Sequence, residues 1–159
     1  MAVRLTGTYV NKIDKKGRVS VPKPFRAFFE GQDFAGVYLF RSFKLAALEG
    51  AGDAFMDEFV NRLDDLDLFS DDQDDLAALI LQNAFQLPFD PEGRVALPKE
   101  LMEHAGLETE AVFAGRGKRF LIFEPDAFKA YDQQLFERAR SRGPTLPAAR
   151  SAKDEDQGP

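Results

Sequence analysis

Alternating apolar and polar residues open the chain and predict strands. Residues 8–13 are rich in β-branched and aromatic side chains, which is typical of a strand. A polar stretch follows, and residues 19–21 then alternate, which predicts a returning strand with one apolar face. Pro22 and Pro24 end that strand and favour a short helix that runs through Phe29.

The same order of elements returns in the second half. Asp53 and Asp126 each precede Ala-Phe, and each is predicted to cap the helix that follows. The unit is strand, turn, strand, short helix, hairpin and helix, used twice. The other predicted elements are strands over 36–40, 44–48, 94–97, 111–114 and 119–124, a helix over 99–105 ended by Gly106, and a long helix over 128–139.

Extra helical sequence separates the two halves. Apolar residues recur there at helical spacing, on one face of an amphipathic helix: Phe55, Phe59, Leu63 and Leu66. Residues 70–73 read Ser-Asp-Asp-Gln, a capping box that opens a second helix. From about residue 141 apolar anchors are scarce, which predicts a disordered tail.

One polar stretch occurs twice in the chain. Residues 14–23 and 90–99 both read Asp-x-x-Gly-Arg-Val-x-aliphatic-Pro-Lys, 76 residues apart. Gly17 and Gly93 fall in the turns, where glycine permits a left-handed backbone. Because an aspartate and an arginine four residues apart can face each other across a tight turn, we expect ion pairs that stiffen both loops.

The first copy of the stretch has more basic chemistry than the second. Lys15 and Lys16 adjoin Arg18, whereas Pro91-Glu92 stands in the corresponding place beside Arg94. A basic turn on a rigid sheet can bind DNA, since arginine forks onto guanine and lysine holds phosphates. A solvated surface turn is the alternative, and the residues alone do not decide between the two.

Composition narrows the class of protein. The chain has 159 residues, is 44% hydrophobic, lacks cysteine and has His104 as its only histidine, so disulfide scaffolds and Cys/His zinc sites are excluded. We expect no catalytic residue, no metal and no cofactor. The start lacks the apolar core of a signal peptide, and the apolar runs are too short to cross a bilayer. We therefore expect a soluble, cytoplasmic protein without a membrane partner.

Charge is divided unevenly along the chain. The net charge of −6 alone argues against a polyanionic partner. Residues 1–30, however, carry seven cations and two carboxylates, a balance of +5, whereas residues 49–75 carry one arginine and eleven carboxylates, a balance of −10. The basic end can face DNA while the acidic helices lie away from it or at subunit edges.

The doubled motif, with Glu103-His104-Ala105-Gly106-Leu107 after its second copy, resembles the paired Asp-x-x-x-Arg motifs of the MraZ family, over roughly residues 4–140. The resemblance implies an α+β fold, with a tandem-duplicated swapped-hairpin AbrB-like β-barrel core and peripheral helices. It further implies a nucleoid-associated transcriptional regulator of the division and cell-wall gene cluster. Such a regulator binds repeated promoter boxes in double-stranded DNA as a homo-oligomeric ring.

Specific roles and boundaries follow from the motif and the resemblance. Arg18 is predicted to read bases and Asp14 to orient the turn, with Arg94 and Asp90 assigned by repeat symmetry. A ring-forming scaffold or antitoxin-like interaction protein, whose turns only shape the fold, is the alternative. The predicted domains are a first repeat over 1–50, an acidic helical insert over 51–83, a second repeat over 84–140 and the tail over 141–159.

Overall fold

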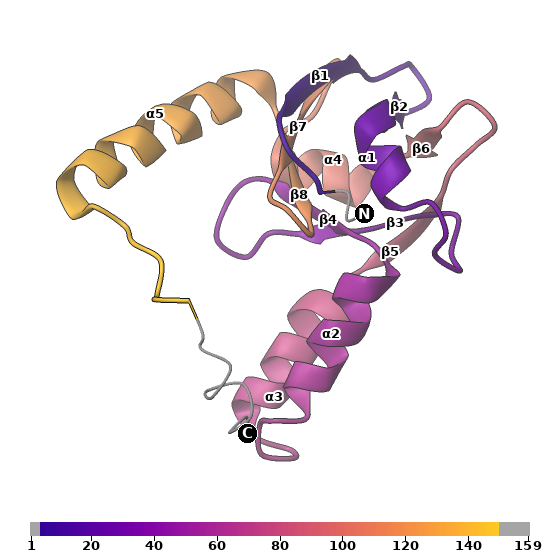
Figure 1. Cartoon of the computed structure of the whole chain (residues 1–159). Helices are drawn as coiled ribbons and strands as arrows, with labels where there is room; N and C mark the ends of the chain where they lie inside the picture. The colour runs from indigo at the N-terminus through magenta and orange to yellow at the C-terminus, as the bar shows by residue number, and fades with distance from the viewer. Residues whose placement is uncertain (1–3, 150–159) are drawn as a thin grey trace. The chain divides into compact units, whose positions relative to one another are not determined.

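The computed structural model describes residues 4–149, and the chain divides into two units, residues 1–128 and residues 129–159. The first unit holds the strands and the start of the last helix (Figure 1). In chain order the elements are β1 (Thr8–Lys12), β2 (Arg18–Ser20), α1 (Lys23–Phe28), β3 (Gly36–Arg41), β4 (Leu48–Ala51), α2 (Asp53–Leu63), α3 (Asp71–Leu76), the π-helix η1 (Ala77–Gln82), β5 (Phe85–Pro88), β6 (Arg94–Ala96), α4 (Lys99–Ala105), β7 (Glu110–Gly115), β8 (Phe120–Phe123) and α5 (Pro125–Arg142).

The two halves of the chain exchange strands. Six strands form one antiparallel sheet in the order β1-β7-β8-β4-β3-β5, and β2 pairs with β6 in a second, two-stranded ladder. Thus β1 of the first half pairs with β7 of the second, and β5 of the second half pairs with β3 of the first. The sheet order reads the same from either end when each strand is replaced by its repeat partner. This pseudo-twofold arrangement confirms the predicted α+β, swapped-hairpin class.

One predicted strand pairing is wrong. The strand over 19–21 was expected to return along residues 8–13 as a hairpin. A single bridge between Ile13 and Val19 joins them, because β1 bonds along its length to β7 and β2 bonds to β6. Pairing between the halves therefore replaces the local hairpin.

The predicted strand over 44–48 is also wrong. Strand β4 begins only at Leu48, and residues 42–47 form a loop. The buried Ser42 hydroxyl accepts hydrogen bonds from the backbone N–H of Lys44 and of Leu45, at 3.2 and 3.1 Å. These bonds turn the backbone and compete with a sheet ladder.

A single hydrophobic core lies under both halves. Phe25 of α1 is fully buried and makes aromatic contacts with Tyr9 of β1 and with Phe113 and Phe120 of β7 and β8. Buried residues of both halves complete this cluster, among them Val19, Val21, Leu39, Leu48, Val95, Leu101 and Ile122. Since each half supplies part of the other's sheet, neither half encloses this core alone.

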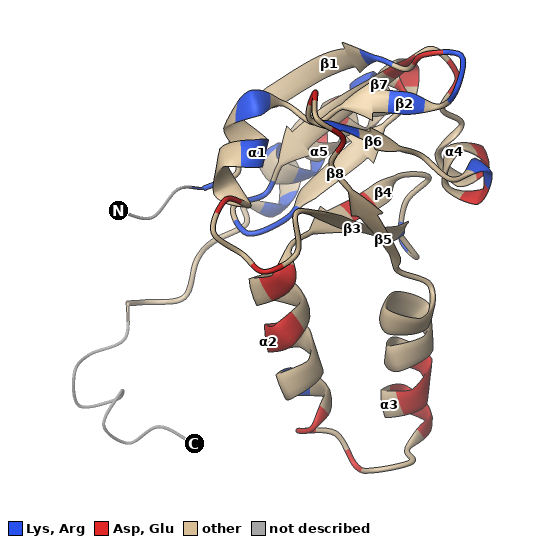
Figure 2. Cartoon of the chain, turned by 90° about the vertical axis from the view of Figure 1, so that its right-hand side faces the viewer, with Lys and Arg blue, Asp and Glu red and all other residues tan. Residues whose placement is uncertain are grey.

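The acidic segment forms a helical hairpin that projects from the sheet (Figure 2). Met56, Phe55, Phe59 and Ile80 pack with Phe40 in a smaller apolar cluster at its base. Leu66 lies beyond the end of α2, so the predicted apolar face is shorter than expected. In the same view, Lys and Arg (blue) lie around the β1–β2 turn and on α1, whereas Asp and Glu (red) lie on α2 and α3.

Helix starts differ from the prediction in both halves. Asp53 does not cap α2: its carboxylate accepts hydrogen bonds from the hydroxyl of Tyr38 and the N–H of Phe34, at 2.8 and 3.0 Å. Helix α5 begins one residue before Asp126, so Glu124 caps it, accepting from the N–H groups of residues 126 and 127 at 2.9 and 3.0 Å. Both predicted caps are wrong. Tyr38 and Phe34 occupy the carboxylate of Asp53, and Glu124 takes the capping place that was predicted for Asp126.

The start of α3 and the end of α5 test two further predictions about helices. The Ser70 cap is confirmed, with its hydroxyl accepting from the N–H of Gln73 at 3.2 Å. Helix α5 continues to Arg142, and residues 143–149 have no helix or strand. The remainder of the predicted tail, 150–159, lies outside the described residues.

Candidate nucleic-acid interface

The first repeated turn is built around the carboxylate of Asp14. Its Oδ1 accepts hydrogen bonds from the backbone N–H of Lys16 and of Arg18, both at 2.9 Å. Its Oδ2 accepts from Nε of Arg18 at 2.7 Å. Backbone bonds between Asp14 and Arg18 and from Gly17 to Asp14 close the loop, at 2.9 and 3.0 Å. The aspartate therefore fixes both the backbone and the arginine side chain.

The second turn repeats this geometry. Asp90 accepts from the N–H of Glu92 and of Arg94, both at 2.9 Å, and from Nε of Arg94 at 2.8 Å. Gly93 adopts a φ of +79°, the same value as Gly17 in the first turn. The predicted ion pairs and left-handed glycines are confirmed in both copies.

Gly93 is restricted more tightly than its counterpart. A Cβ on Gly93 would collide with the guanidinium of Arg26, whereas on Gly17 its nearest neighbour would be the carbonyl oxygen of Leu97 at 3.4 Å. Arg26 in turn donates to the carbonyl of Val21 at 3.1 Å. The second turn is therefore packed against α1, and the positive φ alone restricts the first.

The pleat of the two-stranded ladder sets the direction of both arginines. Val19 and Val95 are opposed in register at its centre, and both are buried in the core. Because side chains alternate along a strand, Arg18 and Arg94 lie on the opposite side from these valines. Their side chains keep 35% and 25% of their exposure.

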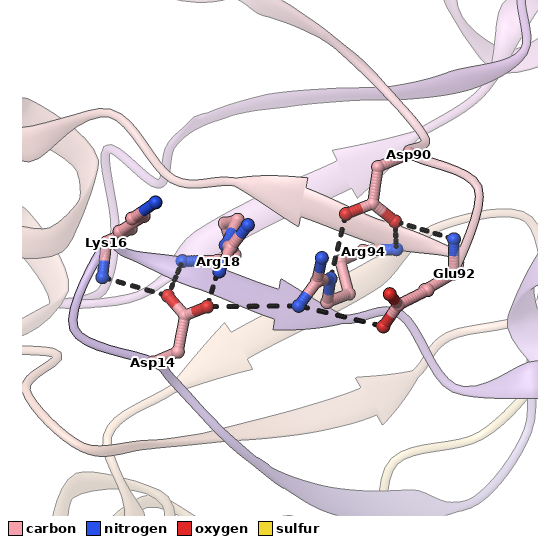
Figure 3. A network of polar contacts seen from close by, with 6 residues as sticks. All are labelled: Asp14, Lys16, Arg18, Asp90, Glu92 and Arg94. Carbon is pink, nitrogen blue, oxygen red and sulfur yellow. Dashed lines mark hydrogen bonds and ion pairs between the residues drawn. The ribbon is translucent and has the colours of Figure 1, made fainter.

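The ladder brings the two motifs together (Figure 3). Nη1 of Arg94 lies 4.0 Å from Oδ2 of Asp14, so one motif's arginine pairs with the other motif's aspartate. The two turns therefore form one polar network. The residue pattern alone did not show this convergence, and the signal for it is the repeat itself, once its swapped pairing is known.

Charge is unequal within the network. Three carboxylates surround Arg94, with Asp90 at 2.8 Å, Glu92 at 3.7 Å and Asp14 at 4.0 Å. Among the described residues, Arg18 has an ion pair with Asp14 alone. Lys15 and Lys16 are exposed at the tip of the first turn. The first turn therefore presents more uncompensated positive charge.

The hydrogen bonds shift the acidity of the two aspartates. Donation from the backbone N–H of Arg18 is the largest cause that holds the pKa of Asp14 below its usual value, and the guanidinium adds to it. Arg94 lowers the pKa of Asp90 in the same way. The hydrogen bond to Asp90 raises the pKa of Arg94, which is charged at any physiological pH.

These shifts predict how the turns respond to acid. Since both aspartate pKa values are lowered in the folded state, the ionised carboxylates stabilise it fully above their ordinary pKa of about 3.9. That stability is lost as pH falls through the lowered values. Melting temperature should be insensitive to these groups between about pH 5 and 8, and Asp14→Asn with Asp90→Asn should reduce the acid-induced loss. An unchanged acid profile in that double variant would contradict the assignment.

Known proteins are similar in sequence to this chain over most of its length. A family model described as "MraZ protein, putative antitoxin-like" matches residues 80–145. A Parvibaculum lavamentivorans protein is 48% identical over 79% of this chain and 78% of its own. Proteins of Rickettsia canadensis and Rickettsia bellii are 41% and 40% identical over 77% and 76% of this chain, and 83% and 81% of their own. The chain belongs to the MraZ family.

Membership of the MraZ family confirms the resemblance carried by the doubled motif. The three relatives are each named "Transcriptional regulator MraZ". No helix within the described part of the chain is both long and apolar enough to span a membrane. Within residues 4–149, no group of three or more His, Asp or Glu residues is arranged to hold a metal ion.

His104 holds a loop in place in this MraZ chain. Its Nε2 lies 3.1 Å from the carbonyl oxygens of both Ser42 and Leu45, so it ties the end of α4 to the loop before β4. Gly106 ends that helix with a φ of +65°, which confirms the predicted C-cap. The histidine therefore positions a loop and contacts neither repeated turn.

The basic turn between β7 and β8 is separate from the doubled motif. Arg119 pairs with Glu49 at 2.6 Å, and the exposed Lys118 lies 4.0 Å from Glu58 of α2. The turn therefore faces the base of the acidic hairpin.

Proposed function

We propose that this chain is a sequence-specific DNA-binding transcriptional regulator. It acts at the nucleoid, in the cytoplasm, as a ring-like homo-oligomer on repeated promoter boxes of the division and cell-wall gene cluster. The names of its relatives support the regulatory role. The observation that carries DNA binding is the convergence of both Asp–Arg turns on the β2–β6 ladder, with Lys15 and Lys16 exposed beside them.

Arg18 is assigned to base reading. Its Nε donates to Asp14, and among the described residues none accepts a hydrogen bond from its two Nη groups. A guanidinium held in this way directs two parallel donors outward, the arrangement that suits O6 and N7 of guanine. Asp14 therefore pre-organises the fork, and the rigid turn lowers the entropy lost on binding.

The lysines and the second motif have different parts. Lys15 and Lys16 are placed to contact phosphates, which give affinity and register without reading sequence. Arg94 makes a lesser contact, because three carboxylates already surround it. Asp90, Gly17 and Gly93 shape the turns.

A homo-oligomer reconciles the basic turn with the acidic chain. A few phosphate contacts from one module bind weakly at physiological salt, and the net charge of −6 opposes the approach of DNA. Several copies on repeated boxes convert later contacts into intramolecular events and raise avidity by about a hundredfold or more. The basic segments then face DNA together.

Salt-dependent binding tests the proposal. Fluorescence anisotropy would compare DNA from upstream of the chain's own gene with a shuffled duplex of the same length at several salt concentrations. We expect preference for the upstream DNA and a steep loss of affinity with salt, with a log–log slope of about −0.9 for each phosphate contacted. Equal, salt-insensitive binding to both duplexes would sink the proposal and favour the scaffold or antitoxin-like alternative.

The charge difference between the turns gives a prediction of gained affinity. Glu92 occupies the place that Lys16 has in the first turn and lies 3.7 Å from Arg94. Glu92→Lys should strengthen DNA binding several-fold at moderate salt and steepen the salt slope by about 0.9 for the added phosphate contact.

Glu100→Lys is the matched control for that variant. Glu100 is exposed on α4, outside the turn network, and the substitution makes the same change in net charge. Equal effects of the two variants would show that only total charge matters. A weaker or unchanged Glu92→Lys complex would remove the second turn from the DNA surface.

A further inference from the structure

The loop between α2 and α3 presents two large apolar side chains to solvent. Leu68 is 73% exposed and Phe69 is 81% exposed. Aspartates precede them in this loop and follow them in the first turn of α3, and we call the whole segment the tip: Asp64, Asp65, Asp67, Asp71 and Asp72. An exposed aromatic at the end of a projecting hairpin is an unfavourable placement unless something covers it.

The backbone of the tip is strained at Phe69 and held there by hydrogen bonds. Phe69 has a φ of +66° and is the one described residue other than glycine with a positive φ. A bulky residue is uncommon in this region, and such outliers cluster where function requires them. Gln73 fixes the strained position, accepting from the N–H of Phe69 and donating to the carbonyl of Leu63, both at 3.1 Å. The tip is therefore pre-organised for contact.

A groove of complementary character runs along α2 of the same hairpin, from Phe55 to Arg62. It has a volume of about 420 Å³ and is formed where α2 meets the β7–β8 turn. Phe55 and Phe59 supply apolar surface. Four cations and one carboxylate line it, and with Glu49, which pairs with Arg119, the local balance is +2: Arg62, Arg116, Lys118, Arg119, Glu58 and Glu49.

The groove continues on the other side of Phe55. An adjoining hollow of about 610 Å³ shares Phe55, Glu58 and Lys118 and adds Arg4 and Phe28. Apolar rings with a basic rim therefore extend over both hollows. A ligand with an apolar centre and an acidic surround fits this surface, which is the composition of the tip.

We propose that the tip of one copy of this chain docks in the groove of a second copy. Phe69 and Leu68 enter between Phe55 and Phe59, while the tip aspartates face Arg62 and Lys118. The apolar rings of the groove, Phe55 and Phe59, lie in the first two turns of α2, whereas the tip follows the end of that helix, so the tip meets the rings of a neighbouring copy rather than its own (Figure 2). The inference rests on the homo-oligomer of the proposed function and names its contact.

The geometry of this contact is head-to-tail. Each copy offers one tip and one groove, which are different surfaces, so the interface is heterologous and closes into a ring when the rotation per subunit permits. The acidic insert then lies in subunit contacts, and the turns before β2 and β6 remain available to DNA. Opposite charges at the rim also steer the encounter and make assembly weaken with salt.

Complementary variants test the contact. Phe69→Gly removes the aromatic and relieves the positive φ, so it should not unfold the chain. Arg62→Glu with Lys118→Glu reverses the groove at two side chains that are 77% and 78% exposed. Leu79→Ala, at an exposed apolar residue of the same hairpin outside the tip, is the control. Sedimentation velocity at micromolar concentration would measure mass, and anisotropy would measure binding to a single box.

The expected results are specific to a head-to-tail contact. Wild type and Leu79→Ala form the oligomer, and each interface variant alone is monomeric, with association weakened at least about tenfold. An equimolar mixture of the two variants gives one-to-one dimers, because one intact tip meets one intact groove. Both monomeric variants still bind a single box, which separates this contact from DNA recognition.

Other outcomes overturn the inference. If Phe69→Gly assembles like wild type, the tip is not the occupant, and DNA binding by that variant would leave the proposed function intact. If the variants are monomeric but do not dimerise on mixing, the contact joins like surfaces instead. Monomeric wild type with sequence-specific DNA binding would remove the ring and this contact together.

Discussion

Arg18→Ala is expected to abolish the preference for promoter DNA over a shuffled duplex. The substitution removes the outward guanidinium and leaves the carboxylate of Asp14 facing the phosphates. A bidentate arginine–guanine contact contributes about 1–3 kcal/mol of discrimination in each subunit, so several subunits on repeated boxes lose it together. Anisotropy titrations at fixed salt would measure the ratio of the two affinities.

The fold should tolerate this change. The backbone N–H of Arg18 still donates to Asp14, and an ion pair between side chains that are each 35% exposed adds little to stability because solvent screens it. Arg18→Lys retains the charge without the fork and should keep non-specific binding while losing specificity. Arg140→Ala, at an exposed arginine of α5, is the control for charge loss. If Arg18→Ala keeps its preference and its affinity, another residue reads the bases.

Local features of the site were predictable from sequence because their partners are close in the chain. Asp14 and Arg18 are four residues apart, and the glycine between them permits the turn that makes them meet. The same spacing sets the Asp90–Arg94 pair. The helix from Lys99 to Ala105 and its glycine cap were likewise predictable, because a proline precedes the helix and a glycine follows it.

Strand pairings between residues far apart in the chain could not be predicted from the sequence. A strand pattern at residues 8–13 shows one apolar face but does not say whether β2 or β7 lies beside it. The contact of Arg94 with Asp14 depends on that choice, since it arises only when β2 pairs with β6. The predicted cap at Asp53 failed for a related reason, because Tyr38 and Phe34 approach its carboxylate only in the folded sheet.

The strand exchange explains why a duplicated motif forms one surface. If each half had folded alone, its turn would have projected separately. Pairing Val19 against Val95 places the two turns at either end of one short ladder and makes the arginines neighbours. Duplication supplied matching shapes, and the divergence of Lys16 and Glu92 gave the shared surface a stronger and a weaker side.

Phe25→Ala is expected to have the largest effect on stability. Its ring is fully buried and meets Tyr9, Phe113 and Phe120 at centroid distances of 5.4, 6.4 and 5.5 Å. Truncating a buried phenylalanine leaves a cavity and costs about 3–5 kcal/mol, against a total of about 5–15 kcal/mol for a typical domain. The melting temperature should fall by roughly 10 °C or more, as calorimetry would measure.

The repeat supplies the control for that variant. Leu101 stands 76 residues after Phe25, at the corresponding place in α4, and is equally buried. Phe25→Leu should therefore fit the pseudo-symmetric core and cost roughly 1–2 kcal/mol, well below the alanine variant. DNA affinity should follow the folded fraction in both, because Phe25 anchors α1 beneath the β2–β6 ladder and does not itself face DNA. A Phe25→Ala protein that melts within a few degrees of wild type would show that the shared core does not depend on this ring, and that the two halves are held together elsewhere.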